Sequence, residues 1–193
     1  MAEDTRFAQL VALACHDLRN PLATVYGFAR VLQRTELGEP SDRYIEMIQA
    51  ASGELGELLD ELTLVARIQA GRFEAGREET DSLELAGTAA AELPEDRVVV
   101  SGEGAVVIVP RAQTSRALAR LSKAAARHGG HDEVSLVVRG AELELSPVSR
   151  SAAPVVLGEE LRELSAAAAV ALIEALGGSL RVDGERLLIR LPS

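Results

Sequence analysis

The sequence lacks several features on which whole classes of protein depend. It contains one cysteine, Cys15, so a disulfide within the chain is excluded. It has no tryptophan and only 3% aromatic residues, so its core has to be built from aliphatic side chains. The formal charge of −10 argues against nucleic-acid binding, because a binder needs a cationic face to displace counterions from phosphate.

Long apolar runs are also missing. The most apolar stretch, 166–176, is interrupted by Glu174, and no run reaches the roughly 18 residues of a membrane-spanning helix. The N-terminus has no basic segment followed by an apolar one, as a signal peptide would. With a hydrophobic content of 47% and a mean hydropathy of +0.10, these absences predict a soluble, cytoplasmic protein without a membrane partner.

Apolar residues in the first 70 positions recur at alternating steps of four and three, the spacing of a helical bundle. One such helix is expected over about 2–34, and a second ends near Gly71. Their seams are Phe7, Val11, Ala14, Leu18, Pro21, Val25, Phe28 and Leu32, and Tyr44, Ile48, Ala51, Leu55, Leu58, Leu62 and Val65. Further apolar residues such as Leu22 and Leu59 widen both stripes beyond what one hairpin covers. We therefore expect a homodimer whose two hairpins form a four-helix bundle.

After Gly71 the pattern changes to short apolar runs interspersed with helical ones. Residues 73–80 are charged and contain glycine, which predicts a linker between a domain at 1–72 and a domain at 81–193. We expect helices at about 81–92 and 111–128 and another that ends at 176. Strands are expected at 98–100, 105–109, 134–139, 142–145, 179–182 and 186–191. The predicted fold class is α+β, a helical hairpin followed by an α/β sandwich.

One histidine of the first expected helix has an unusual position. His16 lies two residues past the seam residue Ala14, so it faces water in the middle of the helix. By itself, a surface histidine on a solvated helix would need no functional explanation. Pro21 favours one, because a proline inside a helix costs about 3 kcal/mol and usually kinks it.

The segment His16-Asp17-Leu18-Arg19-Asn20-Pro21-Leu22 resembles the phospho-acceptor box of two-component histidine kinases at every position. The segments 58–62 and 66–72 are similar to the end of the second helix in the dimerisation and phosphotransfer domain of that family. The resemblance implies that His16 is the phosphorylated residue and that Asp17, Arg19 and Asn20 assist in catalysis.

The residue types of this box suit phosphoryl transfer. A neutral imidazole is a good nucleophile near pH 7. Asp17 can accept a hydrogen bond from one ring nitrogen of His16, which fixes the tautomer and supports the developing imidazolium. Arg19 can hold phosphoryl oxygens or an acidic partner residue, and Asn20 can orient a water, as the family's residue at this position does. The alternative for Arg19 and Asn20 is a solvated helix face without a catalytic role.

The second domain resembles the ATP-binding domain of the same kinases in architecture alone. Segment 121–130 is similar to the asparagine box, but Ala124 stands in place of the magnesium-binding asparagine, and a methyl group cannot ligate Mg²⁺. In segment 143–149, Pro147 replaces the adenine-binding aspartate and Ser149 replaces the first glycine of the next box. The glycine-rich lid is missing as well. We therefore expect a degenerate nucleotide site, a pseudokinase domain that binds neither ATP nor a metal ion or other cofactor.

The expected function is that of a histidine phosphotransferase in a phosphorelay, which shuttles a phosphoryl group between receiver-domain aspartates through His16. Receiver domains of response regulators would be its partners and would supply Mg²⁺. Two alternatives stay open: an autophosphorylating histidine kinase with an atypical nucleotide site, and a non-catalytic dimeric scaffold that binds a response regulator. A complete box beside a degenerate nucleotide site argues against the scaffold, because drift should have eroded both.

Overall fold

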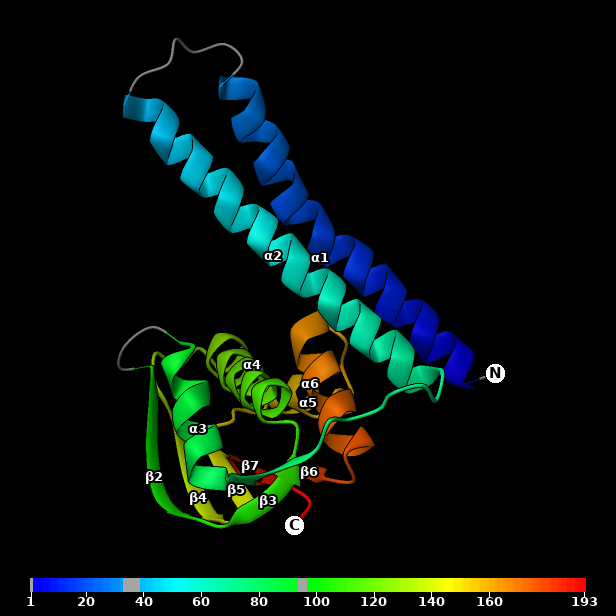
Figure 1. Ribbon diagram of the computed structural model, residues 1–193, viewed down its shortest axis with the longest axis vertical. Coiled ribbons are helices and arrows are strands. Elements are labelled where there is room, and N and C mark those ends of the chain that lie inside the picture. Colours follow the sequence, from blue (N-terminus) through cyan, green and yellow to red (C-terminus); the bar gives the residue numbers. More distant parts are fainter. Residues whose placement is uncertain (1, 33–38, 94–96) are drawn as a thin grey trace. The chain divides into compact units, whose positions relative to one another are not determined.

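The computed structural model describes residues 2–32, 39–93 and 97–193 (Figure 1). The chain divides into two compact units, Met1–Thr63 and Leu64–Ser193. Helix α1 (Ala2–Leu32) and most of helix α2 (Glu39–Gln69) form the first unit, and a β-sheet with helices packed on it forms the second. This arrangement confirms the predicted fold class of a helical hairpin followed by an α/β sandwich.

The hairpin packs along the predicted apolar seams. Ala14 and Ala51 are buried, at 0% and 6% exposure, and Pro21 is buried as well. Towards the end of α1, the rings of Phe28 and Tyr44 stack with their centroids 5.5 Å apart. Alternating steps of four and three therefore place one residue per turn of each helix against the other helix.

Several large apolar side chains of the hairpin lie outside this seam. Leu22, Tyr26 and Leu59 are more than half exposed, and Ile45 is 42% exposed. A soluble protein rarely leaves a contiguous face of this kind in water. Within the first unit, the two helices thus carry more apolar surface than they cover for each other.

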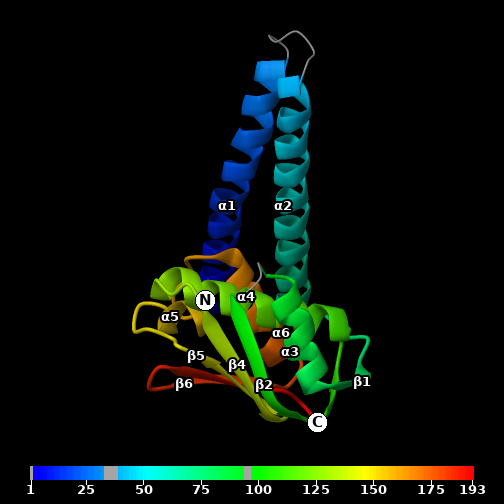
Figure 2. The same ribbon diagram turned by 90° about the vertical axis from the view of Figure 1, so that its left-hand side faces the viewer.

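A five-stranded sheet of order β2-β4-β5-β7-β6 forms the base of the second unit (Figure 2). The pair β2–β4 is parallel and the other three pairs are antiparallel. A separate antiparallel pair joins β1 (Glu78–Asp81) to β3 (Val106–Val109). The five strands are β2 (Val98–Gly104), β4 (Val134–Gly140), β5 (Glu142–Ser146), β6 (Ser179–Asp183) and β7 (Arg186–Arg190).

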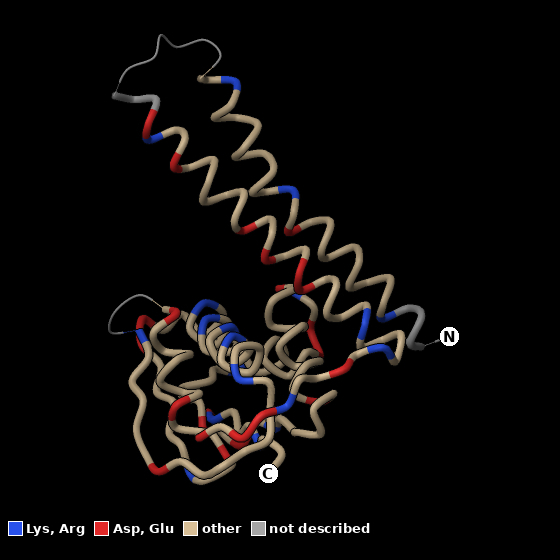
Figure 3. The backbone as a smooth tube through the Cα atoms, viewed as in Figure 1, with Lys and Arg blue, Asp and Glu red and all other residues tan. Residues whose placement is uncertain are grey.

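Helices cover one face of this sheet (Figure 2): α3 (Ser82–Ala91), α4 (Arg111–Gly129), the short α5 (Ala153–Val156) and α6 (Leu164–Ala175). Alternate residues of the strands, such as Leu136 and Leu145, are fully buried with Leu121 of α4 and Ile173 of α6. Basic residues recur along α4 (Figure 3). That helix ends at Gly129, one residue past the expected range 111–128. The next residue, Gly130, has a φ of +70°, the left-handed conformation that glycine adopts without strain.

The predicted linker at 73–80 is wrong in its second half. Residues from Glu78 to Asp81 form β1, and Phe73 and Ala75 pack against the core of the second unit. A four-residue strand with Thr80 as its one buried residue has too little apolar alternation to be recognised in the sequence. At its end, the Asp81 carboxylate caps α3 by accepting a hydrogen bond from the backbone N–H of Leu83 at 2.8 Å.

Candidate phosphotransfer site

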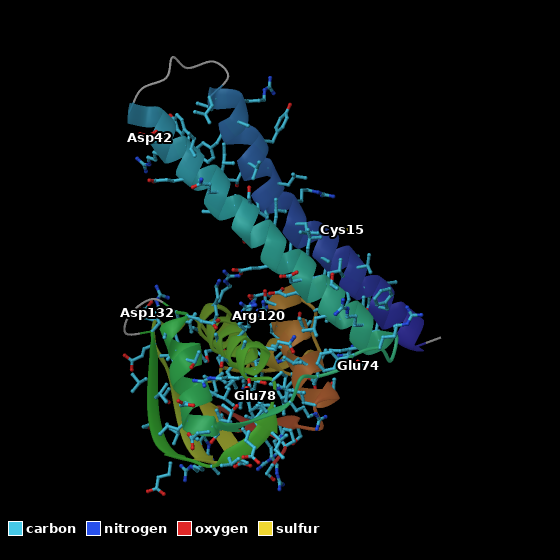
Figure 4. All side chains as sticks on the ribbon, in the orientation of Figure 1. Cys15, Asp42, Glu74, Glu78, Arg120 and Asp132 are labelled. Atoms are coloured by element: carbon cyan, nitrogen blue, oxygen red, sulfur yellow. The ribbon has the colours of Figure 1, made fainter. Side chains whose placement is uncertain are left out.

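Helix α1 presents His16 to solvent. The imidazole is 71% exposed, and the preceding residue, Cys15, is exposed on the same helix (Figure 4). Asp17 is less exposed than His16, with its side chain 20% exposed. Nδ1 of His16 is 3.1 Å from Oδ1 of Asp17, which is hydrogen-bonding distance. Two adjacent residues of one helix therefore form the core of the site.

This contact assigns separate roles to the two ring nitrogens of His16. A carboxylate can only accept a hydrogen bond, so Nδ1 carries the proton and donates it to Asp17. The lone pair of the neutral ring then lies on Nε2, so this is the ring atom able to act as a nucleophile. Because an exposed pair of this kind contributes little to stability, its effect is to orient the ring and to fix its tautomer.

The remaining residues of the box follow along the same helix. Arg19 and Asn20 are exposed, and neither side chain has a hydrogen-bond or ion-pair partner within the described part of the chain. The backbone carbonyl of Asn20 accepts a hydrogen bond from Oγ1 of Thr24 at 3.2 Å. Pro21 has no N–H to donate to the carbonyl of Asp17, yet α1 continues through it to Leu32. The structure thus joins His16 to Asp17 and leaves Arg19 and Asn20 available to a partner.

The second unit has apolar packing at the position predicted for the metal-binding asparagine. Ala124 is fully buried in α4, in the same core cluster as Val148 and Ala152, which follow β5. Pro147 and Ser149, the residues on either side of Val148, are half-buried. Ser149 Oγ lies 2.9 Å from Ser151 Oγ and accepts a weak hydrogen bond from the N–H of Ala152 at 3.3 Å. The hydroxyl group of Ser149 thus contacts polar groups of its own segment.

The segment after Ser149 is anchored to the end of α4. Ser151 Oγ donates a hydrogen bond to the backbone carbonyl of His128 at 2.8 Å. Nε2 of His128 lies 3.2 Å from Oε2 of Glu163, the residue before α6, and a guanidinium nitrogen of Arg127 lies 3.5 Å from the same oxygen. Val155 and Val156 of α5 are buried at 1% and 0% exposure. The segment between β5 and α6 is therefore a packed part of the unit.

Residues 8–71 match the His Kinase A (phospho-acceptor) domain, and the match includes the whole box around His16. This chain therefore contains a phospho-acceptor domain of the histidine kinase type and is histidine-kinase-like. Its phospho-acceptor domain extends over α1 and α2, so the domain ends close to the end of α2 at Gln69.

The curated relatives of this histidine-kinase-like chain are larger proteins that carry the name histidine kinase. Histidine protein kinase DivJ of Caulobacter vibrioides is 34% identical over 80 residues, which are 40% of this chain and 13% of DivJ. The chain spans only 4–25% of the lengths of the four curated relatives with which it was aligned.

Solved structures share the fold of both units. Acinetobacter baumannii histidine kinase AdeS aligns with a TM-score of 0.69 over 92% of this chain and 97% of that chain, at 16% identity. A structure titled as a bacterial phosphotransferase aligns with a TM-score of 0.50 over 96% of this chain and 94% of that chain, at 14% identity. At such identities the likeness concerns the fold alone.

Sequence reasoning missed the contact between His128 and Glu163. The two residues lie 35 positions apart, and neither belongs to a pattern that predicts a pairing. Among the described residues of this histidine-kinase-like protein, no group of three or more His, Cys, Asp or Glu side chains could hold a metal ion. None of the described helices combines the length and the apolar character needed to cross a membrane.

Proposed function

We propose that this protein is a histidine phosphotransferase of a phosphorelay, which passes a phosphoryl group between receiver-domain aspartates through His16 and does not use ATP. One observation carries the proposal. His16 is 71% exposed, with Nδ1 held by Asp17, whereas Ala124 presents a buried methyl group at the place where a kinase needs a metal ligand. The chain has a histidine that can accept a phosphoryl group and lacks the metal ligand that a kinase needs to phosphorylate this histidine from ATP.

The proposed step is an in-line displacement at phosphorus. Nε2 of His16 attacks the phosphoryl group of an aspartyl phosphate, the N–P bond forms, the P–O bond breaks, and the aspartate of the receiver leaves as a carboxylate. The ring becomes cationic, and the Asp17 carboxylate at 3.1 Å from Nδ1 stabilises that charge without removing the proton. Transfer to a second receiver is the reverse step, with the imidazole as leaving group. Mg²⁺ is supplied by the receiver domain.

Packing of the second unit supports the exclusion of ATP as the donor. Mg²⁺ requires oxygen ligands, and in a triphosphate site it bridges phosphate oxygens to protein oxygens. Ala124 supplies none, and the core formed by Ala124, Val148 and Ala152 is apolar. The resemblance in fold to a protein titled as a bacterial phosphotransferase, over 96% of this chain, fits the same proposal.

We further propose that the working form is a homodimer that engages response regulators. Leu22, Tyr26 and Leu59 are 57%, 64% and 53% exposed on the single hairpin. A second hairpin would bury these side chains in a four-helix bundle and would leave His16, on its solvated face, accessible. Arg19 and Asn20, exposed on α1 beside His16, would then face the receiver domain.

The deciding experiment compares two phosphoryl donors. The protein is incubated with labelled ATP and Mg²⁺ in one arm and with a phosphorylated receiver domain in the other. We expect label from the receiver alone, in an acid-labile and alkali-stable form, because a phosphoramidate has these properties and an acyl phosphate is alkali-labile. Labelling by ATP would favour the autophosphorylating kinase, and labelling by neither donor would favour the non-catalytic scaffold.

A further inference from the structure

The second unit contains a cavity of about 350 Å³ beside α4, which we call the α4 cavity. Its lining includes the cationic side chains Arg97, Lys123 and Arg127, together with His131. Val98 and Val134, the first residues of the parallel strands β2 and β4, contribute apolar wall. No Asp or Glu belongs to the lining among the described residues. The sequence analysis assigned no function to any of these residues.

None of the positions assigned to the degenerate nucleotide site, Ala124, Pro147 and Ser149, belongs to the described lining of the α4 cavity. Helix α4 contributes Lys123 and Arg127 to that lining, together with Ser122 and Ala126. Ala124 lies two residues from Ser122 and two from Ala126, which corresponds to about 200° around an α-helix. Ala124 is fully buried in the core. It therefore lies on the face of α4 opposite Ser122 and Ala126.

Two of the three cations that line the cavity have no ion pair among the described residues. Arg97 and Lys123 are exposed and have no ion-pair partner in the part of the chain that the structure describes. Arg127 contacts Glu163 at 3.5 Å and also lies in the last turn of α4, where a cation favours the helix dipole. That explanation does not extend to Lys123, nearly two turns before the helix end, or to Arg97. A cleft lined by one sign of charge concentrates ions of the other sign.

His131 supplies a second, independent observation. Its backbone N–H donates a hydrogen bond to the carbonyl of Ala126 at 3.0 Å, so the residue is fixed to the end of α4 just after Gly130. Its Nε2 is buried and has no hydrogen-bond partner among the described residues. A buried polar atom in this state destabilises the folded protein.

We propose that the α4 cavity binds a small aliphatic phosphate monoester. The phosphoryl group carries a charge of about −1.5 to −2 near pH 7, which matches several cations better than the single charge of a carboxylate does. Arg97 and Arg127 can each hold two phosphate oxygens, with Lys123 as a point charge. Among the described residues the lining has no Phe or Tyr on which a flat ring could stack, so the organic part is aliphatic and lies against Val98 and Val134.

The test uses n-butyl phosphate as probe and two matched compounds, valerate and inorganic phosphate. Valerate has the same alkyl chain with a carboxylate, and inorganic phosphate has the charged group without the chain. Backbone amide signals of the full-length protein are followed by NMR during titration. We expect the signals of Val98, Lys123 and Val134 to move with n-butyl phosphate, at an affinity about tenfold or more above that of either compound.

Variants locate the binding in the cavity. Lys123→Gln and Arg97→Gln should each weaken binding of n-butyl phosphate by about tenfold or more, because each removes one charge-assisted hydrogen bond. Arg116→Gln changes an exposed cation of the same helix that does not line the cavity, and it should leave the affinity unchanged. Dispersed amide spectra show that each variant is folded.

Three results would overturn the proposal. They are amide signals that do not move at a large excess of n-butyl phosphate, binding of valerate or inorganic phosphate as tight as that of n-butyl phosphate, and a loss of affinity in Arg116→Gln as large as in Lys123→Gln. This site is independent of phosphotransfer, so the titration is repeated on the His16→Ala protein, where binding should persist. A failure of the relay hypothesis would therefore leave the result for the cavity intact.

Discussion

The two units of this protein differ in how much structure their chemistry requires. To present an imidazole, the first unit needs one solvated helix position, at His16, and one hydrogen bond, to Asp17. To hold a magnesium triphosphate, the second unit would need oxygen ligands, a cavity and a glycine-rich loop at a helix terminus. Ala124 and Val148 lie instead in a continuous apolar core. A phosphoryl-acceptor site that needs few side chains can persist beside a degenerate nucleotide site, because a nucleotide site needs many.

The comparison also separates fold from chemistry. AdeS, a histidine kinase, shares the fold over 92% of this chain. The sequence nevertheless predicts that Ala124, Pro147 and Ser149 stand in place of the residues with which a kinase domain holds nucleotide. Core packing maintains an α/β sandwich whether or not its loops bind ATP. The fold alone therefore does not decide between a kinase and a phosphotransferase, and experiments on individual residues can.

The largest effect is expected from His16→Ala. This change removes the nucleophile, so labelling by a phosphorylated receiver should fall below detection. Because the side chain is exposed, the free energy of unfolding should change by no more than about 0.5 kcal/mol. Autoradiography gives the labelling, and thermal unfolding monitors the fold. His131→Ala, a histidine change in the second unit, is the control and should retain full labelling. Label on the His16→Ala protein would refute the assignment of the phosphorylated residue.

A smaller but substantial loss is expected from Asp17→Asn. The substitution keeps the size of the side chain and removes the charge that stabilises the cationic ring, so the transfer rate should fall about 10²–10⁴-fold. Rapid-quench measurement at saturating receiver separates this rate from binding. If the rate stays within a factor of three of the wild type, Asp17 does not act on His16.

Dimerisation should respond to Leu59→Asp. Leu59 is 53% exposed on the single hairpin, so the change should be tolerated by a monomer, whereas a four-helix bundle would have to bury the new charge. We expect the dimer Kd to rise by about 100-fold or more, as measured by light scattering over a dilution series. Ala50→Asp is the matched control, because Ala50 is exposed about 180° around α2 from Leu59. A wild-type protein that is monomeric at micromolar concentration would contradict the dimer.

No effect at all is expected from ATP and Mg²⁺ on thermal stability. A ligand present at 100 times its Kd adds about 2.7 kcal/mol to the free energy of unfolding, which would raise the melting temperature visibly. With Ala124 in place of a metal ligand, millimolar nucleotide should leave the melting temperature unchanged. A rise that disappears when Pro147 or Ser149 is substituted would instead support the autophosphorylating kinase.

Much of the fold could be predicted because the sequence repeats its signals. The seams of α1 and α2 recur over many turns, and α4 covers the expected range 111–128. The strand β1 and the short helix α5 could not, because four residues contain about one turn of periodicity. The contact of His128 with Glu163 also has no local signature, since it depends on how α6 packs beside α4.

The sequence by itself predicts which residue is the nucleophile and which nucleotide ligands are replaced. His16, Asp17 and Pro21 stand in an uninterrupted motif on one helix, and the identity of Ala124 is sufficient to remove a metal ligand, because local spacing and side-chain chemistry decide both. Tertiary structure alone decided that the segment after Ser149 packs into the core. It also decided that Arg97, from the start of β2, meets Lys123 of α4 at one cavity. Contacts between distant segments depend on packing, which no short pattern encodes.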